Sequence, residues 1–211
     1  MLLLRRFAHF ALAGMLLLPA GCVNPFKPAS PEGAGSGGVA EIFDSPDDVL
    51  DTMARAIESK SEAGTNAWLH ALADSYQQFY DIDVRRDWKK ANSQDGPDPW
   101  TLNDERKLPS LLFRFKATAN YALAWDPDPA FNDHLPDAAD TAQFHRKYTI
   151  TADDQSTKSV IAIGYADLSF QLVNGKWSIT AWNDRVDPTV GVNPSSDART
   201  MSWWRLESTI R

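Results

Sequence analysis

Few residues of this chain have types and spacing suited to acid–base chemistry. Asp184 and Arg185 adjoin each other, but neighbouring strand residues point to opposite faces and cannot serve one ligand together. His70 lies off the apolar stripe of its predicted helix, His145 alternates with apolar residues, and His134 lies in an acidic loop. Each is better explained as a structural ion pair or a solvated side chain, because a catalytic base needs burial to adjust its pKa. The sequence therefore assigns no catalytic residue.

Three residues near the end of the chain are candidates for binding. Asn183 ends an apolar row of the last predicted hairpin, where its amide could donate to and accept from a ligand. A bond to a loop backbone is the alternative. Tyr165 and Trp182 fall on the more polar face of the same hairpin, and aromatic residues outside a core often mark interfaces. For these two, packing under the C-terminal segment is equally plausible.

Metal and cofactor sites are not indicated. The loop from Asp126 to Asp133 is rich in aspartate, but its prolines and its lack of glycine depart from the calcium loop of an EF-hand. A single cysteine excludes a Cys-based zinc site and a disulfide within the chain. The sequence contains no Gly-rich phosphate-binding motif. We expect no metal and no cofactor.

Composition places the chain among globular proteins. Its 211 residues are 43% hydrophobic and 11% aromatic, enough to build a packed core. The formal net charge is −7, which argues against a nucleic-acid partner because such partners need clustered Lys and Arg.

Cys22 ends an apolar leader. Arg5 and Arg6 precede the apolar stretch Phe7–Leu18, which spans about 18 Å and is too short for a ~30 Å hydrocarbon core. The segment Pro19-Ala20-Gly21-Cys22 resembles the lipobox of bacterial lipoproteins, although the proline stands where leucine is usual. The resemblance implies a signal peptide at 1–21, an acyl chain such as palmitate at Cys22, and a membrane-anchored protein of the cell envelope. We expect the outer membrane, facing the periplasm. An ordinary cleaved signal is the alternative.

The rest of the chain divides into a tether and one domain. Residues 22–44 are rich in Pro, Gly and Ser, as linkers are, and the domain follows at 45–211. Ser45 with Pro46 predicts a helix start, and apolar stripes indicate helices over about 46–57 and 65–76. A strand is expected over 76–84. A third helix is expected between Thr101 and Phe115, interrupted at Pro109.

Period-two patterns indicate strands over about 115–125 and 144–150, and Asn174-Gly175 predicts a tight hairpin. A two-residue turn places Leu172 opposite Trp177, Phe170 opposite Ile179 and Leu168 opposite Ala181, in one apolar row ending at Asn183. On the other face it pairs Asp167 with Trp182 and Tyr165 with Asp184.

The order of elements and the C-terminal sequence of the domain resemble those of the nuclear transport factor 2-like (SnoaL-like) superfamily. That ending runs through Gly175-Lys176-Trp177-Ser178-Ile179, Trp182-Asn183-Asp184-Arg185 and Asp187-Pro188, with a late tail at Trp203-Trp204-Arg205-Leu206. The resemblance implies an α+β cone: a curved, mostly antiparallel sheet with about three helices from the N-terminal half packed on one face. Enzymes of the superfamily use an Asp or His base beside a Tyr in the interior, and many members dimerise through the outer sheet face.

We expect a non-catalytic envelope lipoprotein whose cone binds a small apolar ligand or a partner protein, with a homodimer through the sheet face and no nucleic acid. The alternatives are an isomerase or dehydratase using the same cone, or a purely structural component. A buried Asp or His beside a Tyr would favour the enzyme hypothesis, and an apolar cavity would favour ligand binding. A cone filled by its own side chains would favour the structural role.

Overall fold

The structure is a computed structural model that describes residues 38–80, 89, 99–115, 117–136 and 139–187. All of these belong to one compact unit, Gly33–Arg211. Cys22, most of the expected tether and the tail at 203–206 lie outside the described residues.

The four helices whose bounds lie within the described ranges begin where side chains satisfy the first free backbone N–H groups or where the apolar stripe resumes. They are α1 (Pro46–Ser59), α2 (Glu62–His70), α4 (Leu102–Glu105) and α5 (Leu108–Phe115). Ser45 accepts a hydrogen bond from the backbone of Asp48 at 3.1 Å, as an N-cap does, and Thr101 forms a capping box with Asp104. Both caps confirm the helix starts expected from the sequence.

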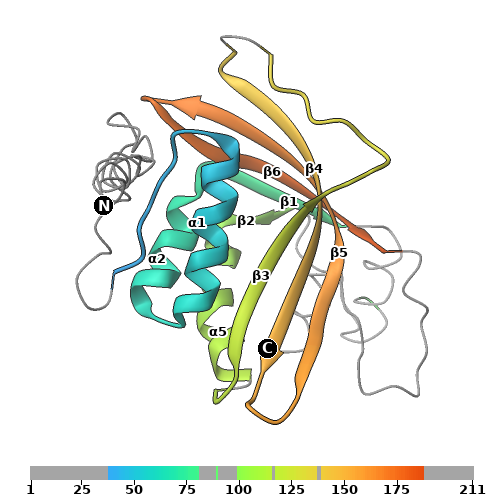
Figure 1. The fold of residues 1–211 in the computed structure, drawn as a ribbon. Helices are drawn as coiled ribbons and strands as arrows, with labels where there is room; N and C mark the ends of the chain where they lie inside the picture. The colour runs from blue at the N-terminus through green and yellow to red at the C-terminus, as the bar shows by residue number, and fades with distance from the viewer. Residues whose placement is uncertain (1–37, 81–88, 90–98, 116, 137–138, 188–211) are drawn as a thin grey trace, which may run out of the picture. The chain divides into compact units, whose positions relative to one another are not determined.

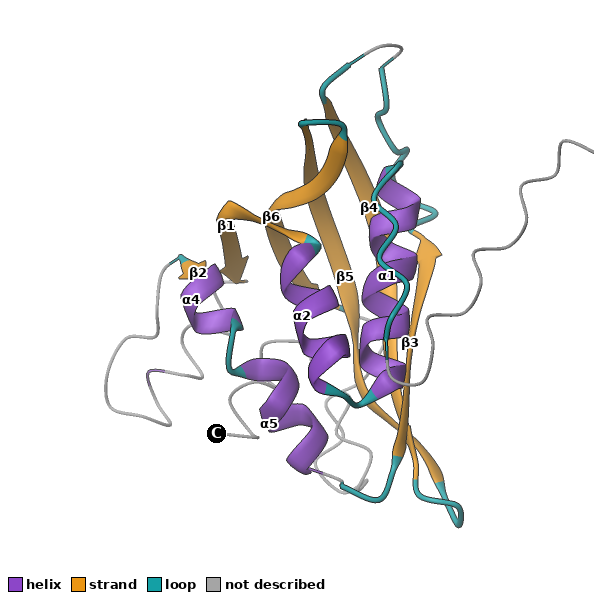
Figure 2. Cartoon of the chain, turned by 90° about the vertical axis from the view of Figure 1, so that its left-hand side faces the viewer, coloured by secondary structure: helices purple, strands orange, loops and turns teal. Residues whose placement is uncertain are grey.

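Six strands form one curved sheet in the order β2-β1-β6-β5-β4-β3. Their bounds are β1 (Leu72–Tyr80), β2 (Trp100–Thr101), β3 (Asn120–Pro127), β4 (Thr141–Asp153), β5 (Lys158–Val173) and β6 (Lys176–Val186). Only the pair β1–β6 is parallel among these strands. The helices lie on the concave face of the sheet (Figures 1 and 2), which confirms the predicted α+β class and the cone.

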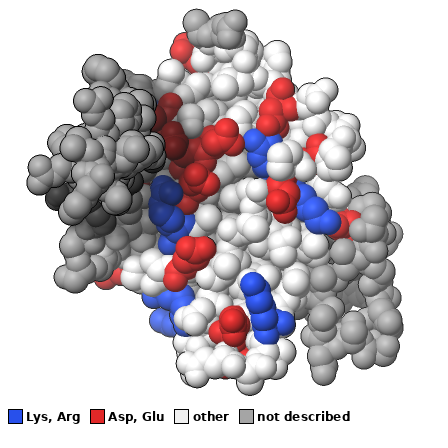
Figure 3. All heavy atoms as spheres, viewed as in Figure 1, with Lys and Arg blue, Asp and Glu red and all other residues white. Residues whose placement is uncertain are grey.

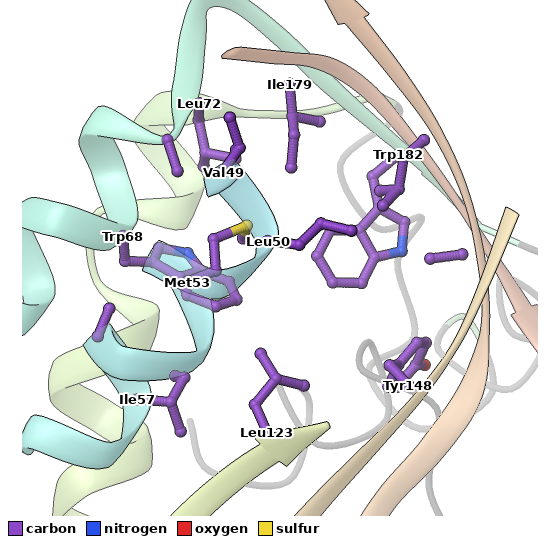
Figure 4. Close-up of a cluster of buried hydrophobic side chains, with 14 of the residues drawn as sticks. Val49, Leu50, Met53, Ile57, Trp68, Leu72, Leu123, Tyr148, Ile179 and Trp182 are labelled. Carbon is purple, nitrogen blue, oxygen red and sulfur yellow. The ribbon is translucent and has the colours of Figure 1, made fainter. Parts of the chain in front are cut away.

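The core lies between this face and the helices. The apolar stripe of α1 and Trp68 of α2 point into it, and the inner residues of β3, β4 and β6 meet them (Figure 4). Trp68, Trp182 and Tyr148 are each at most 1% exposed. Large aromatic side chains therefore make up much of the core.

The domain extends further towards the N-terminus than the expected boundary at residue 45. Phe43 is 7% exposed, and its carbonyl accepts from the backbone N–H of Trp177 at 2.9 Å. Ile42 exchanges two hydrogen bonds with the side chain of Thr52. Residues 38–44, expected in the tether, thus pack on the domain.

Candidate functional site in the cone

One extra residue in β6 determines which side chains reach the interior. The Asn174-Gly175 turn, with φ values of 53° and 77°, sets the predicted register as far as Phe170 opposite Ile179. Beyond that point Ser169 pairs with Ala181, so Thr180 has no partner of its own on β5. This is a β-bulge, and it exchanges the two faces for every later residue.

The predicted positions of Asn183 and Trp182 are therefore wrong. Trp182 pairs with Leu168 and is 1% exposed in the core. Asn183 pairs with Asp167 on the outer face and is exposed, so it does not line the interior. Asp184, expected outside, pairs with Ala166 and is 3% exposed inside.

The bulge brings Asp184 to Tyr148 of β4. The Tyr148 hydroxyl donates to Oδ1 of Asp184 at 2.6 Å, and the tyrosine is 0% exposed. The rings of Trp125, Trp182 and Tyr148 lie in mutual contact, with centroids 5.5–6.1 Å apart. A short hydrogen bond to a carboxylate is thus set into an aromatic wall.

Gly164 makes this contact possible. It pairs with Tyr148 on the strand between β4 and β6, and a Cβ at this position would lie 2.5 Å from the tyrosine oxygen. The same Cβ would lie 2.9 Å from the carbonyl oxygen of Arg185. Only glycine lets the phenol cross β5 and reach Asp184.

The neighbouring strand adds further polar groups to the interior. Tyr80 pairs with Asp184 and Gln78 with Trp182, which puts both β1 residues beside the aromatic wall. Gln78 is 0% exposed, and its carbonyl oxygen accepts from Tyr76 at 3.0 Å. The interior therefore combines a large apolar surface with a few polar groups, as ligand sites do.

A second buried carboxyl group lies among the helices. Glu105 of α4 is 0% exposed and accepts from the indole N–H groups of Trp68, at 2.8 Å, and Trp100, at 3.0 Å. Burial raises the pKa of Glu105 to about 7, although the two indole donors act in the opposite direction. The group ties α4 to α2 and β2.

The outer face of the sheet carries an ion-pair cluster. Arg185 contacts Asp167 at 2.7 Å and Asp128 at 3.0 Å, and His145 contacts Asp167 at 2.7 Å. Burial opposes ionisation of Asp167, but the hydrogen bonds from Arg185 and His145 outweigh it and hold the pKa of this carboxyl below its usual value. His145 is thus part of an outer cluster, as the alternation predicts.

Tyr165 lies on this outer face, as expected. Its ring is flanked by the Lys147 ammonium group at 5.6 Å and the Arg185 guanidinium group at 5.3 Å. Its role in an interface stays a prediction.

Among the described residues, no cluster of His, Cys, Asp or Glu is placed to hold a metal ion. No helix in the same part of the chain is both long and apolar enough to span a membrane.

No family model and no curated protein sequence matches this chain. Several solved structures resemble it. A variant of a protein of unknown function from Mycobacterium tuberculosis has a TM-score of 0.51 at 11% identity, over 78% of this chain and 80% of that one. A nuclear transport factor 2-like protein with a cystatin-like fold from Novosphingobium aromaticivorans has a TM-score of 0.49 at 10% identity, over 72% and 82%. A nuclear transport factor 2-like protein of unknown function from Pseudomonas putida has a TM-score of 0.45 at 11% identity, over 66% and 82%.

The strand order and the helices on the concave face agree with the cone that the resemblance to nuclear transport factor 2-like proteins implies. At identities this low, the likeness shows the fold alone. The site must be argued from its own residues.

Sequence reasoning missed the Tyr148–Asp184 pair because it placed the two side chains on opposite faces. A signal was present in the sequence. The large apolar residues stand at odd positions up to Ile179 and at an even position in Trp182, and this change of parity marks the bulge.

Proposed function

We propose that this protein is a lipid-anchored protein of the bacterial cell envelope whose nuclear transport factor 2-like cone binds a small apolar ligand without transforming it. The lipobox-like segment ending at Cys22 supports the anchor. The cone fold supports ligand binding, because it surrounds an aromatic interior with a curved sheet and helices.

The observation that carries the binding proposal is the Tyr148–Asp184 pair. A carboxyl group is costly to bury in apolar surroundings, and Asp184 is 3% exposed. The tyrosine that donates to it, Tyr148, belongs to a cluster of three aromatic rings. Replacing buried charged groups with apolar residues of similar volume often leaves a core equally stable or makes it more stable. The pair supplies the polar contact that would orient an otherwise apolar ligand.

The test compares two probes that differ by one hydroxyl group. We expect 2-naphthol to bind the purified protein more tightly than naphthalene in a calorimetric titration. Tyr148→Phe should remove this preference and leave naphthalene binding unchanged. Asn183→Ala is the matched control, because Asn183 precedes Asp184 but lies exposed on the outer face. The proposal would be contradicted if neither probe binds. It would also be contradicted if Tyr148→Phe prefers 2-naphthol over naphthalene as strongly as the wild type does.

The same pair favours a second function, an isomerase or dehydratase acting in the cone. A buried Asp beside a Tyr could remove a proton next to a carbonyl group, with the Tyr hydroxyl hydrogen-bonding the developing oxyanion. The discriminating assay is deuterium exchange at the α-carbons of 2-tetralone in D₂O, followed by NMR. Exchange faster than in buffer and lost in Asp184→Asn would establish the enzyme. Exchange at the buffer rate leaves binding as the function.

A further inference from the structure

A cleft lies outside the cone interior, where the start of β1, the end of α2, the segment before α1 and the β5–β6 hairpin come together. Its volume is about 760 Å³, within the range of small-molecule sites. Neither Tyr148 nor Asp184 lines it. It is therefore a separate site, and it stands independently of the function proposed for the interior.

The floor of the cleft is apolar. Phe43, Leu72 and Trp177 contribute to the lining and are 5–7% exposed, and Leu69 and Leu102 are partly buried beside them. Val173, at the hairpin tip, is 48% exposed at the rim. This apolar surface would accept a hydrocarbon chain or ring.

Two cations of the cleft have no ion-pair partner among the described residues. Five charged or titratable side chains line it: Glu41, His70, Asp74, Arg106 and Lys176. Glu41 and His70 contact each other at 3.0 Å. Within the described part of the chain, Asp74, Arg106 and Lys176 have no ion-pair partner. With His70 uncharged, the lining carries two cations and two carboxylates, and Glu41 is the carboxylate that His70 engages. Among the described residues, Arg106 and Lys176 therefore outnumber Asp74, the one lining carboxylate without a partner.

Several other cations of the described residues are engaged by carboxylates. The chain carries a net charge of −7, and on the face drawn in Figure 3 Lys and Arg side chains are interspersed with Asp and Glu. Arg146, Lys147 and Arg185 all contact carboxylates. Arg106 and Lys176 instead remain available at the edge of one apolar cleft.

We propose that this cleft binds an amphipathic anion, a molecule with a single anionic group on an aliphatic body. The aliphatic body would lie on Phe43, Leu69 and Trp177. The anionic group would be held by Arg106 and Lys176, whose donors suit a carboxylate or a phosphate.

The test uses octanoate as the probe, with acetate and 1-octanol as its two halves. Calorimetric titration of the purified full chain should show octanoate binding more tightly than either half. Octyl phosphate, run in parallel, distinguishes a phosphate from a carboxylate preference. Raising the salt concentration should weaken octanoate binding but not 1-octanol binding.

Charge variants give changes of opposite sign. Lys176→Gln and Arg106→Gln should each weaken octanoate binding roughly two- to fivefold, as exposed ion pairs do, whereas Asp74→Asn should strengthen it. All three side chains are exposed, so these variants should fold. Lys158→Gln, which removes an exposed charge at the far end of β5, is the control and should leave the affinity unchanged. Octanoate binding that is absent, or that responds to none of the three variants, would overturn the proposal.

Discussion

The stability of the domain should fall as Glu105 ionises. Its ordinary pKa is 4.5 and its pKa in the folded protein is about 7. At about 1.4 kcal/mol for each pH unit, this difference corresponds to about 3 kcal/mol of unfolding free energy.

The sign follows from proton binding. Between pH 4.5 and about 7 the folded protein holds a proton on Glu105 that the unfolded chain has lost. The free energy of unfolding therefore decreases as the pH rises through this window. Above it, Glu105 causes no further change. The contribution of Glu105 is fully present only below the unfolded pKa.

The assay is urea unfolding of the wild type and of Glu105→Gln at several pH values from 4.5 to 8.5. Other titrating groups contribute to both proteins, so the difference between them isolates Glu105. We expect the wild type to lose about 3 kcal/mol relative to the variant across this range. The amide of the variant keeps only one acceptor oxygen for the two indole donors, so the variant should be less stable than the wild type with a protonated Glu105. Because the amide does not titrate, this loss should not change with pH.

An independent readout comes from the indole protons themselves. The N–H resonances of Trp68 and Trp100 should shift with pH in the wild type, with a midpoint near 7, because both donate to this carboxyl group. A wild-type-minus-variant stability difference that is flat to within about 0.5 kcal/mol would refute the burial argument. Indole resonances that titrate near pH 4.5 would refute it in the same way.

Four other substitutions test the site and the anchor. Gly164→Ala should destabilise the domain by about 1–3 kcal/mol in thermal unfolding, because its Cβ would overlap the Tyr148 oxygen; an unchanged midpoint would contradict the close approach. Trp182→Ala should cost about 3–5 kcal/mol and Asn183→Ala less than about 0.5 kcal/mol. The reverse order would mean that β6 has no bulge. Cys22→Ser should release the protein from the membrane fraction or leave it unprocessed, and normal processing with unchanged membrane association would remove the anchor.

Much of the architecture could be predicted from local patterns. Ser45 and Thr101 start helices because their side chains satisfy N-terminal N–H groups, and Asn174-Gly175 turns because both residues accept positive φ. Trp177 and Ile179 are buried as the two-residue turn requires. These features depend on a few adjacent residues, so the sequence alone determines them.

The interior pair could not be predicted in the same way. Strand alternation assumes that each residue advances the pairing by one step, and Thr180 breaks this assumption without the glycine that often marks a bulge. Similarly, the meeting of Glu105 with Trp68 joins residues 37 positions apart, and no local pattern specifies that contact. The second helix ends at His70, not near 76, and the first strand begins at Leu72. Leu72 and Tyr76, which fit the apolar stripe of a helix, belong to β1 and are buried there.

The parallel pairing of β1 with β6 has a consequence for how the chain folds. β1 lies at Leu72–Tyr80, and its neighbour β6 lies at Lys176–Val186, so the sheet cannot incorporate its N-terminal strand until nearly the whole domain has been synthesised. Closing so long a loop is slow, because its entropy must be lost before the new contacts form. During synthesis the β1–β6 pair can therefore form only after β6 has been made. Such late closure is compatible with the export that the lipobox-like segment at Cys22 led us to propose.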